Sequence, residues 1–477
     1  MKKYRIIIIS FLLVFYACQK EEFIKQENTL FQGEIFSKEE INKKILDIFI
    51  EKGKVDWSDL NEEELWSAVK LSENNLITVL LNFESNNDAE KKEIIDFIVT
   101  SEKKPIKDVV FEINDNLKYL TVKILKKETF LELMKMEKVE FIEPEYSMYT
   151  EEEYASFETE PIRKLSDIKF LQKTPYLKGV FNSHNISYAW EEGLSGEKVK
   201  IAIIDNGMVR EDKLFGENGD PNGDNSHSRT FEKTGTYKRK WWKSNAKYDG
   251  NWAIKKNSTY RHGTNMATIA AGPSGKSTTG IAYNADLISV RSSNYVFIDW
   301  PPNKKGVIKA FEYLSTVSSV KIISMSQGGI IGSRAMSRAI DKCHQKGKLI
   351  FCAAGTFPKI GNLIGDWLTC FPARYKNTYS VTGVTNSENL NNADWCRSCF
   401  GVADFVVEFW GHKGSSSEST SSTAGMAALI WSENPSLTGA AVINKMISGA
   451  DNQYKSYPFG YGRVDMAKIY PEKLKEQ

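Results

Sequence analysis

The sequence predicts a doubly wound α/β fold, with a mostly parallel sheet covered by helices on both faces, for residues 185–470. Apolar runs alternate with helical patterns along this part of the chain, and several runs lack polar–apolar alternation, so both faces of those strands are buried. The runs are Val199–Ile204, Leu287–Val290, Lys321–Met325, Leu349–Ala353, Tyr379–Val384 and Phe405–Phe409. The helical patterns include His262–Ala271, Gly306–Val317, Ala335–Lys346 and Ser417–Trp431.

Length and charge narrow the functional classes. The 477 residues exceed one ordinary domain and suit two or three. Hydrophobic residues make up 41% and charged residues 26%, which is typical of globular rather than disordered proteins. Lysine and arginine number 63 and aspartate and glutamate 61, so the charge gives no reason to expect nucleic acid as a partner.

The first residues are typical of an export signal. A basic N-terminus precedes an apolar run of about 12 residues, shorter than the roughly 20 that span a bilayer. Residues 1–17 are therefore expected to be a signal peptide. The stretch Phe15 to Cys18 resembles a bacterial lipobox, which implies lipidation of Cys18 and anchoring in the bacterial cell envelope, at the outer membrane and its surface. The alternative is a plain secretory peptide with an incidental cysteine.

Three segments precede the predicted sheet. Residues 18–76 are polar and acidic and are interpreted as a tether or spacer without a visible function. Residues 77–148 predict a small α/β module. Its patterns are Ile77–Leu81 and Tyr119–Ile124 for strands, Ala89–Val99 and Glu128–Met136 for helices, and Val139–Pro144 as a closing segment. Residues 149–184 are polar and predict a linker that holds a processing site.

Three polar residues occupy positions that are typical of catalytic groups, at the end of a strand or the start of a helix. Asp205 ends a buried apolar run, and catalytic groups in such sheets gather at the carboxyl ends of strands. His262 begins a helix of small residues. Ser417 lies in a hydroxyl-rich turn at the start of a buried helix, where unpaired amides can meet an oxyanion. Each has a structural alternative: an aspartate that caps a turn, a surface or core histidine, and a serine that caps a helix.

Together, in the order Asp, His, Ser, these residues resemble the subtilisin family of serine proteases. The resemblance covers residues 185–470 and includes spaced supporting segments. These are Gly280–Ala285, Ile323–Gly329, Phe371–Arg374 and Gly460–Asp465. It implies a serine endopeptidase that cleaves protein or peptide substrates through an acyl-enzyme. Ser417 would attack the carbonyl, His262 would move the proton, and Asp205 would orient the imidazole.

The order and ending of residues 77–148 resemble the inhibitor-type propeptide of the same family. This resemblance implies that the catalytic domain binds its own propeptide and processes itself. The expected cut lies between about Tyr146 and Lys173, in the polar linker. Because the lipid would stay on the propeptide piece, the catalytic domain would be released or held only by noncovalent contact.

The resemblance also assigns the nucleophile and the substrate-binding positions. Several neighbouring serines compete, and counting back from Ala424-Gly425 to the family's Gly-Thr-Ser selects Ser417. The strand that would bind substrate backbone by edge pairing corresponds to Ser326, Gln327 and Gly328. Thr356 replaces the asparagine that donates its side chain to the oxyanion hole. In a subtilisin, loss of that donor costs about 10²–10³ in turnover.

Two other functions compete with the protease. Thr356 favours a catalytically weak or inactive lipoprotein that keeps the fold and uses its cleft only to bind peptides, whereas the complete triad and the inhibitor-like module favour the enzyme. The segment Ala270–Ser277 approaches a phosphate-binding loop. Its first glycine is replaced by alanine and a helix rather than a strand precedes it, so that context fails.

No cofactor is required for this chemistry, although calcium is a weak candidate. Asp220, Asn222 and Asp224 place oxygen ligands at the alternating spacing of calcium loops, but no glutamate follows at the expected distance, so a polar turn is the alternative. With Cys18 lipidated, five cysteines remain. The CxxC pair Cys396–Cys399 lacks the second ligand pair that zinc needs, which leaves a local disulfide or two free thiols.

Overall fold

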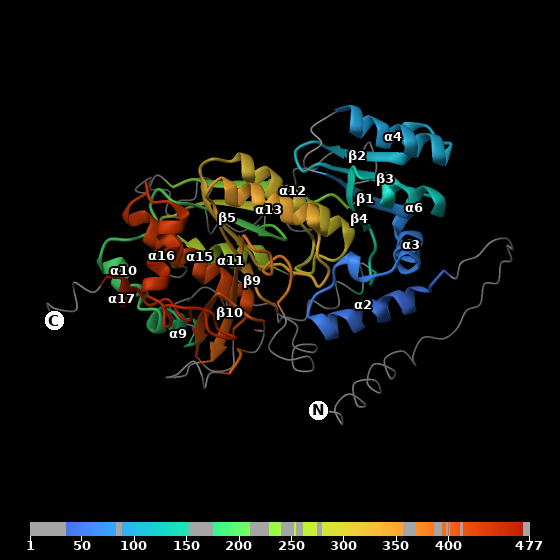
Figure 1. Cartoon of the computed structure of the whole chain (residues 1–477). Coiled ribbons are helices and arrows are strands. Elements are labelled where there is room, and N and C mark those ends of the chain that lie inside the picture. The colour runs from blue at the N-terminus through green and yellow to red at the C-terminus, as the bar shows by residue number, and fades with distance from the viewer. Residues whose placement is uncertain are drawn as a thin grey trace, which may run out of the picture.

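A computed structural model describes two units that lie side by side (Figure 1). The described residues are 35–82, 88–150, 153, 175–209, 229–239, 252–253, 261–273, 279–355, 369–385, 394–396, 399, 401–410 and 414–470. The predicted signal peptide and Cys18 lie outside them. Within these ranges, no helix combines the length and the apolar character needed to cross a membrane.

The N-terminal unit is a four-stranded antiparallel sheet with helices around it, drawn in blue and teal in Figure 1. Its strands are β1 (Leu76–Leu81), β2 (Val110–Asn114), β3 (Tyr119–Lys123) and β4 (Val139–Pro144), in the order β2-β3-β1-β4. Its helices are α2 (Lys38–Lys52), η1 (Trp57–Asp59), α3 (Glu62–Leu71), η2 (Glu73–Asn75), α4 (Asp88–Glu102), α5 (Ile106–Val109) and α6 (Lys127–Lys135).

The second unit is built on a seven-stranded parallel sheet. The strands are β5 (Lys200–Asp205), β6 (Phe231–Gly235), β7 (Asp286–Arg291), β8 (Val320–Met325), β9 (Leu349–Ala353), β10 (Tyr379–Thr385) and β11 (Phe405–Phe409), in the order β11-β10-β9-β8-β5-β7-β6. The helices are α9 (Pro175–Ser183), α10 (Ile186–Glu191), α11 (His262–Ala271), α12 (Pro301–Thr316), α13 (Arg334–Gln345), α15 (Ser416–Glu433), α16 (Gly439–Ser448) and α17 (Met466–Ile469).

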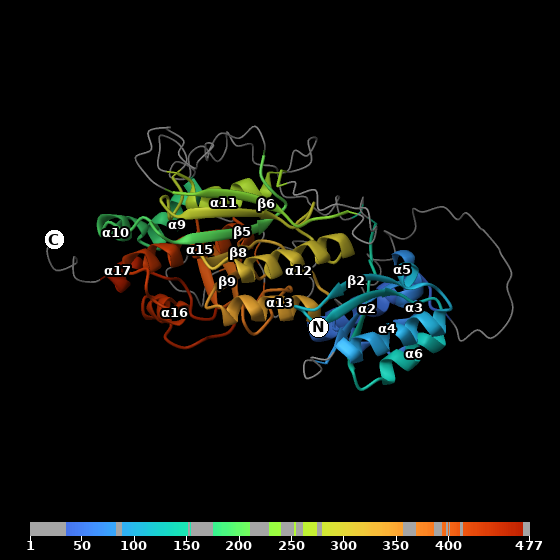
Figure 2. The same ribbon diagram turned by 90° about the horizontal axis from the view of Figure 1, so that it is seen from above.

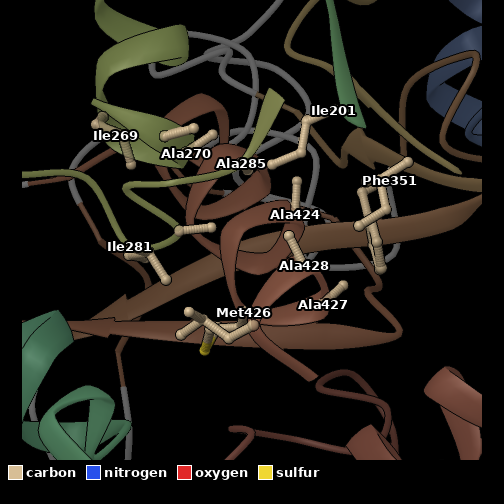
Figure 3. Close-up of a cluster of buried hydrophobic side chains, with 14 of the residues drawn as sticks. Ile201, Ile269, Ala270, Ile281, Ala285, Phe351, Ala424, Met426, Ala427 and Ala428 are labelled. Carbon is tan, nitrogen blue, oxygen red and sulfur yellow. The ribbon is translucent and has the colours of Figure 1, made fainter. Parts of the chain in front are cut away.

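Successive side chains of the central strands lie in two different hydrophobic cores, because side chains alternate between the two faces of a strand. On β5, Ile201 and Ile203 join a buried cluster with α11 and α15, in which Ala424 and Ala428 pack close to the sheet (Figure 3). Ala202 and Ile204 face the other cluster, with α12 and α13. The parallel sheet is therefore covered on both faces, as the unalternating apolar runs predicted.

The two units share apolar and polar contacts. Leu80, Leu117 and Tyr119 of the N-terminal unit belong to the same buried cluster as the inner faces of α12 and α13. Figure 2 shows the small sheet beside the ends of these two helices. The Nζ of Lys305 on α12 donates to the hydroxyls of Thr78 (2.8 Å) and Thr121 (2.9 Å) on the small sheet.

The sequence-based boundaries agree closely with the structure where the apolar pattern is strong. The six predicted strands of the second unit agree to within one residue at each end, and α11 spans the predicted range. Helix α12 begins at Pro301, five residues before the predicted start at Gly306, because proline is tolerated in the first helical turn. Strands β2 and β6 and helix α16 were not predicted. Helix α9 lies inside the range predicted as a linker, 149–184.

Candidate active site

The site lies at the carboxyl ends of two neighbouring parallel strands. In the pairing of β5 with β8, Ile204 is opposite Met325. Asp205, the last residue of β5, and Ser326, the first residue after β8, therefore leave the sheet beside each other, and paired strands lie about 4.8 Å apart. Since all seven strands are parallel, this edge also receives the loops that lead into the covering helices.

Asp205 and His262 form a buried hydrogen-bonded pair. The Nδ1 of His262 lies 2.8 Å from each carboxylate oxygen of Asp205, and the two side chains are 5% and 1% exposed. An Nδ1–H that donates to this carboxylate leaves Nε2 as the nitrogen that can accept a proton. The geometry thus selects one tautomer of the imidazole.

Asn206 and Gly263 hold the start of α11 against the end of β5. The backbone amide of Gly263 donates to the side-chain oxygen of Asn206 at 3.0 Å. A Cβ on Gly263 would lie 2.4 Å from the carbonyl oxygen of Gly207 and 3.1 Å from the Cβ of Asp205. Only glycine at this position lets His262 approach the carboxylate so closely. Neither residue was predicted from the sequence to belong to the site.

Ser417 lies in the first turn of α15, where Ser415 is the N-cap and accepts from the amide of Glu418 at 3.2 Å. The hydroxyl of Ser326 donates to the carbonyl of Ser417 at 3.1 Å. Among the described residues, the partner of the Ser417 hydroxyl is the carbonyl oxygen of Ser326, at 3.5 Å. This contact attaches Ser417 to the end of β8, next to the strand that ends in Asp205.

Helices α11 and α15 pack against one another behind these residues. A Cβ on Gly425 would lie 2.9 Å from the carbonyl oxygen of Ala270, so the two helices are in close contact in their third turns. Both begin at the edge where β5 and β8 end. The structure therefore brings Asp205 and His262 into direct contact, and it holds Ser417 at the adjacent strand end.

The segment predicted to pair with substrate, Ser326–Gly328, is hydrogen-bonded to another part of the same chain. The amide of Gly328 donates to the carbonyl of Val296, and the amide of Ile298 donates to the carbonyl of Gly328, both at 3.0 Å. The next residue, Gly329, exchanges two hydrogen bonds with Phe371, each at 2.9 Å. A peptide that pairs with Gly328 on this side must first displace residues 296–298.

A buried polar network links this edge to Asp205. Ser292 donates its amide to the carbonyl of Asp205 at 2.9 Å, and its hydroxyl lies 2.7 Å from the Oε1 of Gln327. The Nε2 of Gln327 in turn donates to the hydroxyl of Ser293 and to the carbonyl of Tyr295 at 3.2 Å. The side chain of Gln327 is therefore used within the protein. Ser292 gave no signal in the sequence, because a serine after a strand is common.

Asp299 holds the turn at residues 329–331, which directly follows the segment Ser326–Gly328. Its carboxylate accepts from the amides of Ile330 at 2.8 Å and Ile331 at 3.2 Å. Burial raises the pKa of Asp299, and the positive charge of Lys304 opposes this shift. A Cβ on Gly329 would lie 2.4 Å from Oδ1 of this carboxylate, so the turn requires glycine there.

The described cysteines offer no competing nucleophile. Cys396 and Cys399 form a disulfide, which resolves the alternative left open by the sequence, and Cys343, Cys352 and Cys370 are buried free thiols. Burial raises the pKa of Cys343 and of Cys370 to about 12, so both are neutral thiols at pH 7. The thiolate is the nucleophilic form of cysteine, so these buried neutral thiols are not activated nucleophiles.

Several predicted site residues fall outside the described part of the chain. These are Thr356 at the oxyanion position and the calcium candidates Asp220, Asn222 and Asp224. In the described ranges, no group of three or more histidine, cysteine, aspartate or glutamate side chains is arranged to hold a metal ion. The calcium hypothesis therefore stays a prediction.

Comparisons with known proteins give a consistent set of relatives. Subtilisin DY of Bacillus licheniformis is 26% identical over 289 residues, which cover 58% of this chain and 92% of that protein. Subtilisin E of Bacillus subtilis (strain 168) is 27% identical over 289 residues, covering 58% of this chain and 66% of that protein. Alkaline elastase YaB of Bacillus sp. (strain YaB) is 29% identical over 216 residues, covering 43% and 53%.

Solved structures and a family model also match this chain. MycP1 from the ESX-1 type VII secretion system has a TM-score of 0.45 at 16% identity, covering 61% of this chain and 84% of that one. Sphericase has a TM-score of 0.43 at 19% identity, covering 60% and 97%. The model of the subtilase family matches residues 196–462, more than half of the chain. The chain therefore belongs to the subtilase family of serine peptidases.

Proposed function

We propose that this protein is an active serine endopeptidase in which Asp205, His262 and Ser417 form the catalytic triad. One observation carries the proposal: a buried carboxylate–imidazole pair stands at the end of β5, and the first turn of α15 is attached to the adjacent strand end. An imidazole whose Nδ1–H is held by a carboxylate can accept a proton at Nε2. That is the group that a serine nucleophile needs.

In this mechanism, the hydroxyl of Ser417 turns from the carbonyl of Ser326 to the Nε2 of His262. His262 removes the proton as Ser417 attacks the peptide carbonyl, and the same proton then passes to the leaving amine. Asp205 stabilises the imidazolium between these two steps. Amides in the first turn of α15 lack intrahelical partners, so they support the developing oxyanion. Thr356 is proposed as the second donor.

We further propose that residues 77–148 are an inhibitory propeptide. Their attachment to α12 and α13 supports this role. The Nζ of Lys305 is 3.2 Å from a carboxylate oxygen of Glu145, and the carboxylate of Glu143 accepts from the hydroxyl of Ser333 and from the amide of Arg334 at the start of α13. A carboxylate at a helix N-terminus is favourable because of the unpaired amides there. Self-cleavage between Tyr146 and Lys173 would follow.

The cellular setting is proposed from the sequence. A signal peptide over residues 1–17 and lipidation of Cys18 would attach the precursor to the bacterial cell envelope. Cleavage in the linker would leave the lipid on the propeptide piece. The substrate class is protein or peptide, including the protein's own linker.

A fluorophosphonate probe tests the catalytic assignment. We expect the probe to label the wild-type protein and the Ser419→Ala variant, and to leave Ser417→Ala unlabelled. Ser419 is the matched control, because it is buried in the same helical turn and its hydroxyl bonds to the carbonyl of Ser415 at 3.0 Å. Labelling of Ser417→Ala, or none in the wild-type protein after removal of the propeptide, would refute the assignment.

Intact-mass analysis tests self-processing. Wild-type protein should yield two pieces with a junction between residues 146 and 173, and Ser417→Ala should remain one chain. A junction that forms equally in both proteins would show that another protease makes the cut.

The second candidate is a peptide-binding protein without turnover. The occupied edge at Gly328 and the bond from the Ser417 hydroxyl to Ser326 favour it. In that case the probe would label neither protein, while peptides would still bind and survive intact.

A further inference from the structure

Residues 35–60, which precede the inhibitor-like sheet, form a compact element that we call the docking arm. It consists of α2, a short connection and η1. Ser37 and Glu40 form a capping box at the start of α2, and Gly53, at a φ of 69°, ends the helix in the left-handed region. This stretch lies within residues 18–76, the expected tether or spacer. The apolar face of α2 is buried, and residues of the arm contact both the exit from the small sheet and the second unit, which we call the catalytic unit from here on.

The arm first contacts the catalytic unit through a backbone pairing at Val55. The amide of Val55 donates to the carbonyl of Ile330 at 3.2 Å, and the amide of Gly332 donates to the carbonyl of Val55 at 2.9 Å. Val55 is fully buried. Arg374 adds a hydrogen bond from its guanidinium to the carbonyl of Gly53. This pairing occupies the same stretch of chain that continues from Ser326–Gly328.

Side chains reinforce this backbone contact. Ile330 and Ile331 of the catalytic unit belong to one apolar cluster with residues of the arm and of β4. The arm contributes Ile41, Ile45, Ile48, Phe49, Val55, Trp57 and Leu60. The amides of Ile330 and Ile331 are bound by Asp299 of the same unit, so this surface has hydrogen bonds that do not depend on the arm.

The arm also holds the chain that leaves the small sheet. The Nδ2 of Asn42 on α2 donates to the carbonyl of Met148 at 2.9 Å, and the hydroxyl of Tyr146 lies 2.6 Å from the Oδ1 of Asn42. Trp57 packs edge-on against Tyr146, with ring centroids 6.3 Å apart. These contacts fix residues 145–149, immediately before the predicted processing region.

The end of this exit segment lies close to residues 296–298, which pair with the predicted substrate-binding segment at Gly328. Tyr149 packs against the buried cluster of Tyr237, Phe297 and Trp300. Phe297 lies between the two residues whose backbones pair with Gly328. The arm, the exit segment 145–149 and residues 296–298 thus form one continuous set of contacts.

We propose that the docking arm is a second inhibitory element, which binds the strand edge at 330–332 of its own catalytic unit and keeps the exit segment 145–149 seated beside the substrate edge. The proposal rests on the proposed inhibitory role of residues 77–148, and it adds an anchor outside that module. The small sheet contacts α12 and α13, whereas the docking arm contacts residues 330–332 of the catalytic unit. Release of the catalytic unit then requires both contacts to open.

Hydrogen exchange on the full chain tests the contact without requiring activity. In a Ser417→Ala background, Val55→Pro removes the amide that donates to Ile330, and Asn42→Asp removes the amide that donates to Met148. Lys43→Ala is the control, because Lys43 lies on the exposed face of the same helix. We expect the amide of Gly332 and those of residues 145–149 to exchange about tenfold faster in the first two variants than in the control. Amides of β1 and β3 should keep their protection.

Probe labelling in the active background tests the inhibitory role. Val55→Pro and Asn42→Asp precursors should react with the fluorophosphonate about fivefold or more faster than Lys43→Ala. Equal exchange at Gly332 in Val55→Pro and in the control would overturn the contact. Faster exchange with unchanged labelling would overturn the inhibitory role. If no variant labels even after removal of the propeptide, the catalytic assignment is wrong, while the exchange data still decide whether the arm docks.

Discussion

The Nδ1 of His262 lies 2.8 Å from both carboxylate oxygens of Asp205, and this pair is almost completely shielded from solvent. The shared contact restrains the plane of the ring and the position of its proton together. We therefore expect Asp205→Asn to fold normally and to lose turnover by about 10⁴-fold, the size of loss known for replacement of a triad aspartate in serine proteases. Peptide hydrolysis and thermal unfolding should be measured together. Asp47→Asn, at an exposed position on α2, should change neither, and wild-type turnover in Asp205→Asn would refute the role.

Gly263 controls the approach of α11 to β5. Gly263→Ala would put a Cβ 2.4 Å from the carbonyl oxygen of Gly207, so the helix must move and carry His262 away from Asp205. We expect turnover to fall by about 10²-fold, since a displacement near 1 Å suffices for such a loss. Gly439→Ala in α16 is the control, because its Cβ also meets a close backbone oxygen, at 2.9 Å, in a different helix. Equal turnover in the two variants would contradict this account.

Entry of a peptide beside Gly328 requires residues 296–298 to separate from it. Ile298→Pro removes the amide that donates to the carbonyl of Gly328 and weakens this pairing. The rate constant kcat/KM should rise about fivefold for long peptides, which pair with the edge, and stay unchanged for a small ester. Ile298→Val, which keeps the amide, should behave as wild type. A parallel rise for both substrates would show that the edge pairing is not what limits entry.

Lys305 and Lys309 lie one turn apart on α12 and differ in burial. Lys305 is 6% exposed and bonds to Thr78, Thr121 and Glu145, whereas Lys309 is 23% exposed and pairs with Glu112. Lys305→Met should weaken docking of the N-terminal unit by about 3–5 kcal/mol, because it leaves a buried carboxylate without its cation.

Lys309→Met should cost about 1 kcal/mol or less, because Lys309 is partly exposed and Glu112 keeps the ammonium group of Lys305 at 3.7 Å. Exchange of β1 amides in a Ser417→Ala background measures both effects on the same molecule. Comparable losses in the two variants would mean that burial of the ammonium group does not determine the strength of docking.

The burial of His184 predicts that the folded protein loses stability when the pH is lowered. Its ring is fully buried, its Nδ1 lies 2.6 Å from the carbonyl of Val464, and its Nε2 accepts from the amide of Glu408. Burial lowers the pKa of His184, so the unfolded chain binds the proton more tightly than the folded protein. The stabilising contribution is therefore present above the ordinary histidine value of about 6.5 and is lost as the pH falls below it.

The slope expected from His184 is about 1.4 kcal/mol per pH unit below that value. Urea unfolding of wild type and of His184→Gln should differ most at pH 8 and progressively less toward pH 5. Gln345→Ala, at an exposed position without a titratable group, is the control and should show a constant difference. A His184→Gln penalty that does not change with pH would rule out this titration.

The sequence carried the fold class of the second unit, and it named the residues that we propose for its site. Runs such as Leu349–Ala353 are short and have no polar face, which favours buried strands, and their predicted boundaries agree with the structure to within one residue. Asp205, His262 and Ser417 could be named because each stands at the junction of a strand or loop with a helix in a family-like order. Edge strands with exposed residues, such as β6, escaped prediction because their pattern is weak.

Tertiary structure alone decided which distant residues meet. Nothing local indicates that Ser292 bridges Asp205 and Gln327, that residues 296–298 pair with Gly328, or that Val55 pairs with Ile331. These are contacts between backbone groups or small hydroxyls, which every sequence contains and which carry no periodic signal. Sequence determined the chemistry available to this protein because chemistry resides in side-chain type. Which edges are open and which are occupied depends on how separate segments pack, and only the folded chain establishes that.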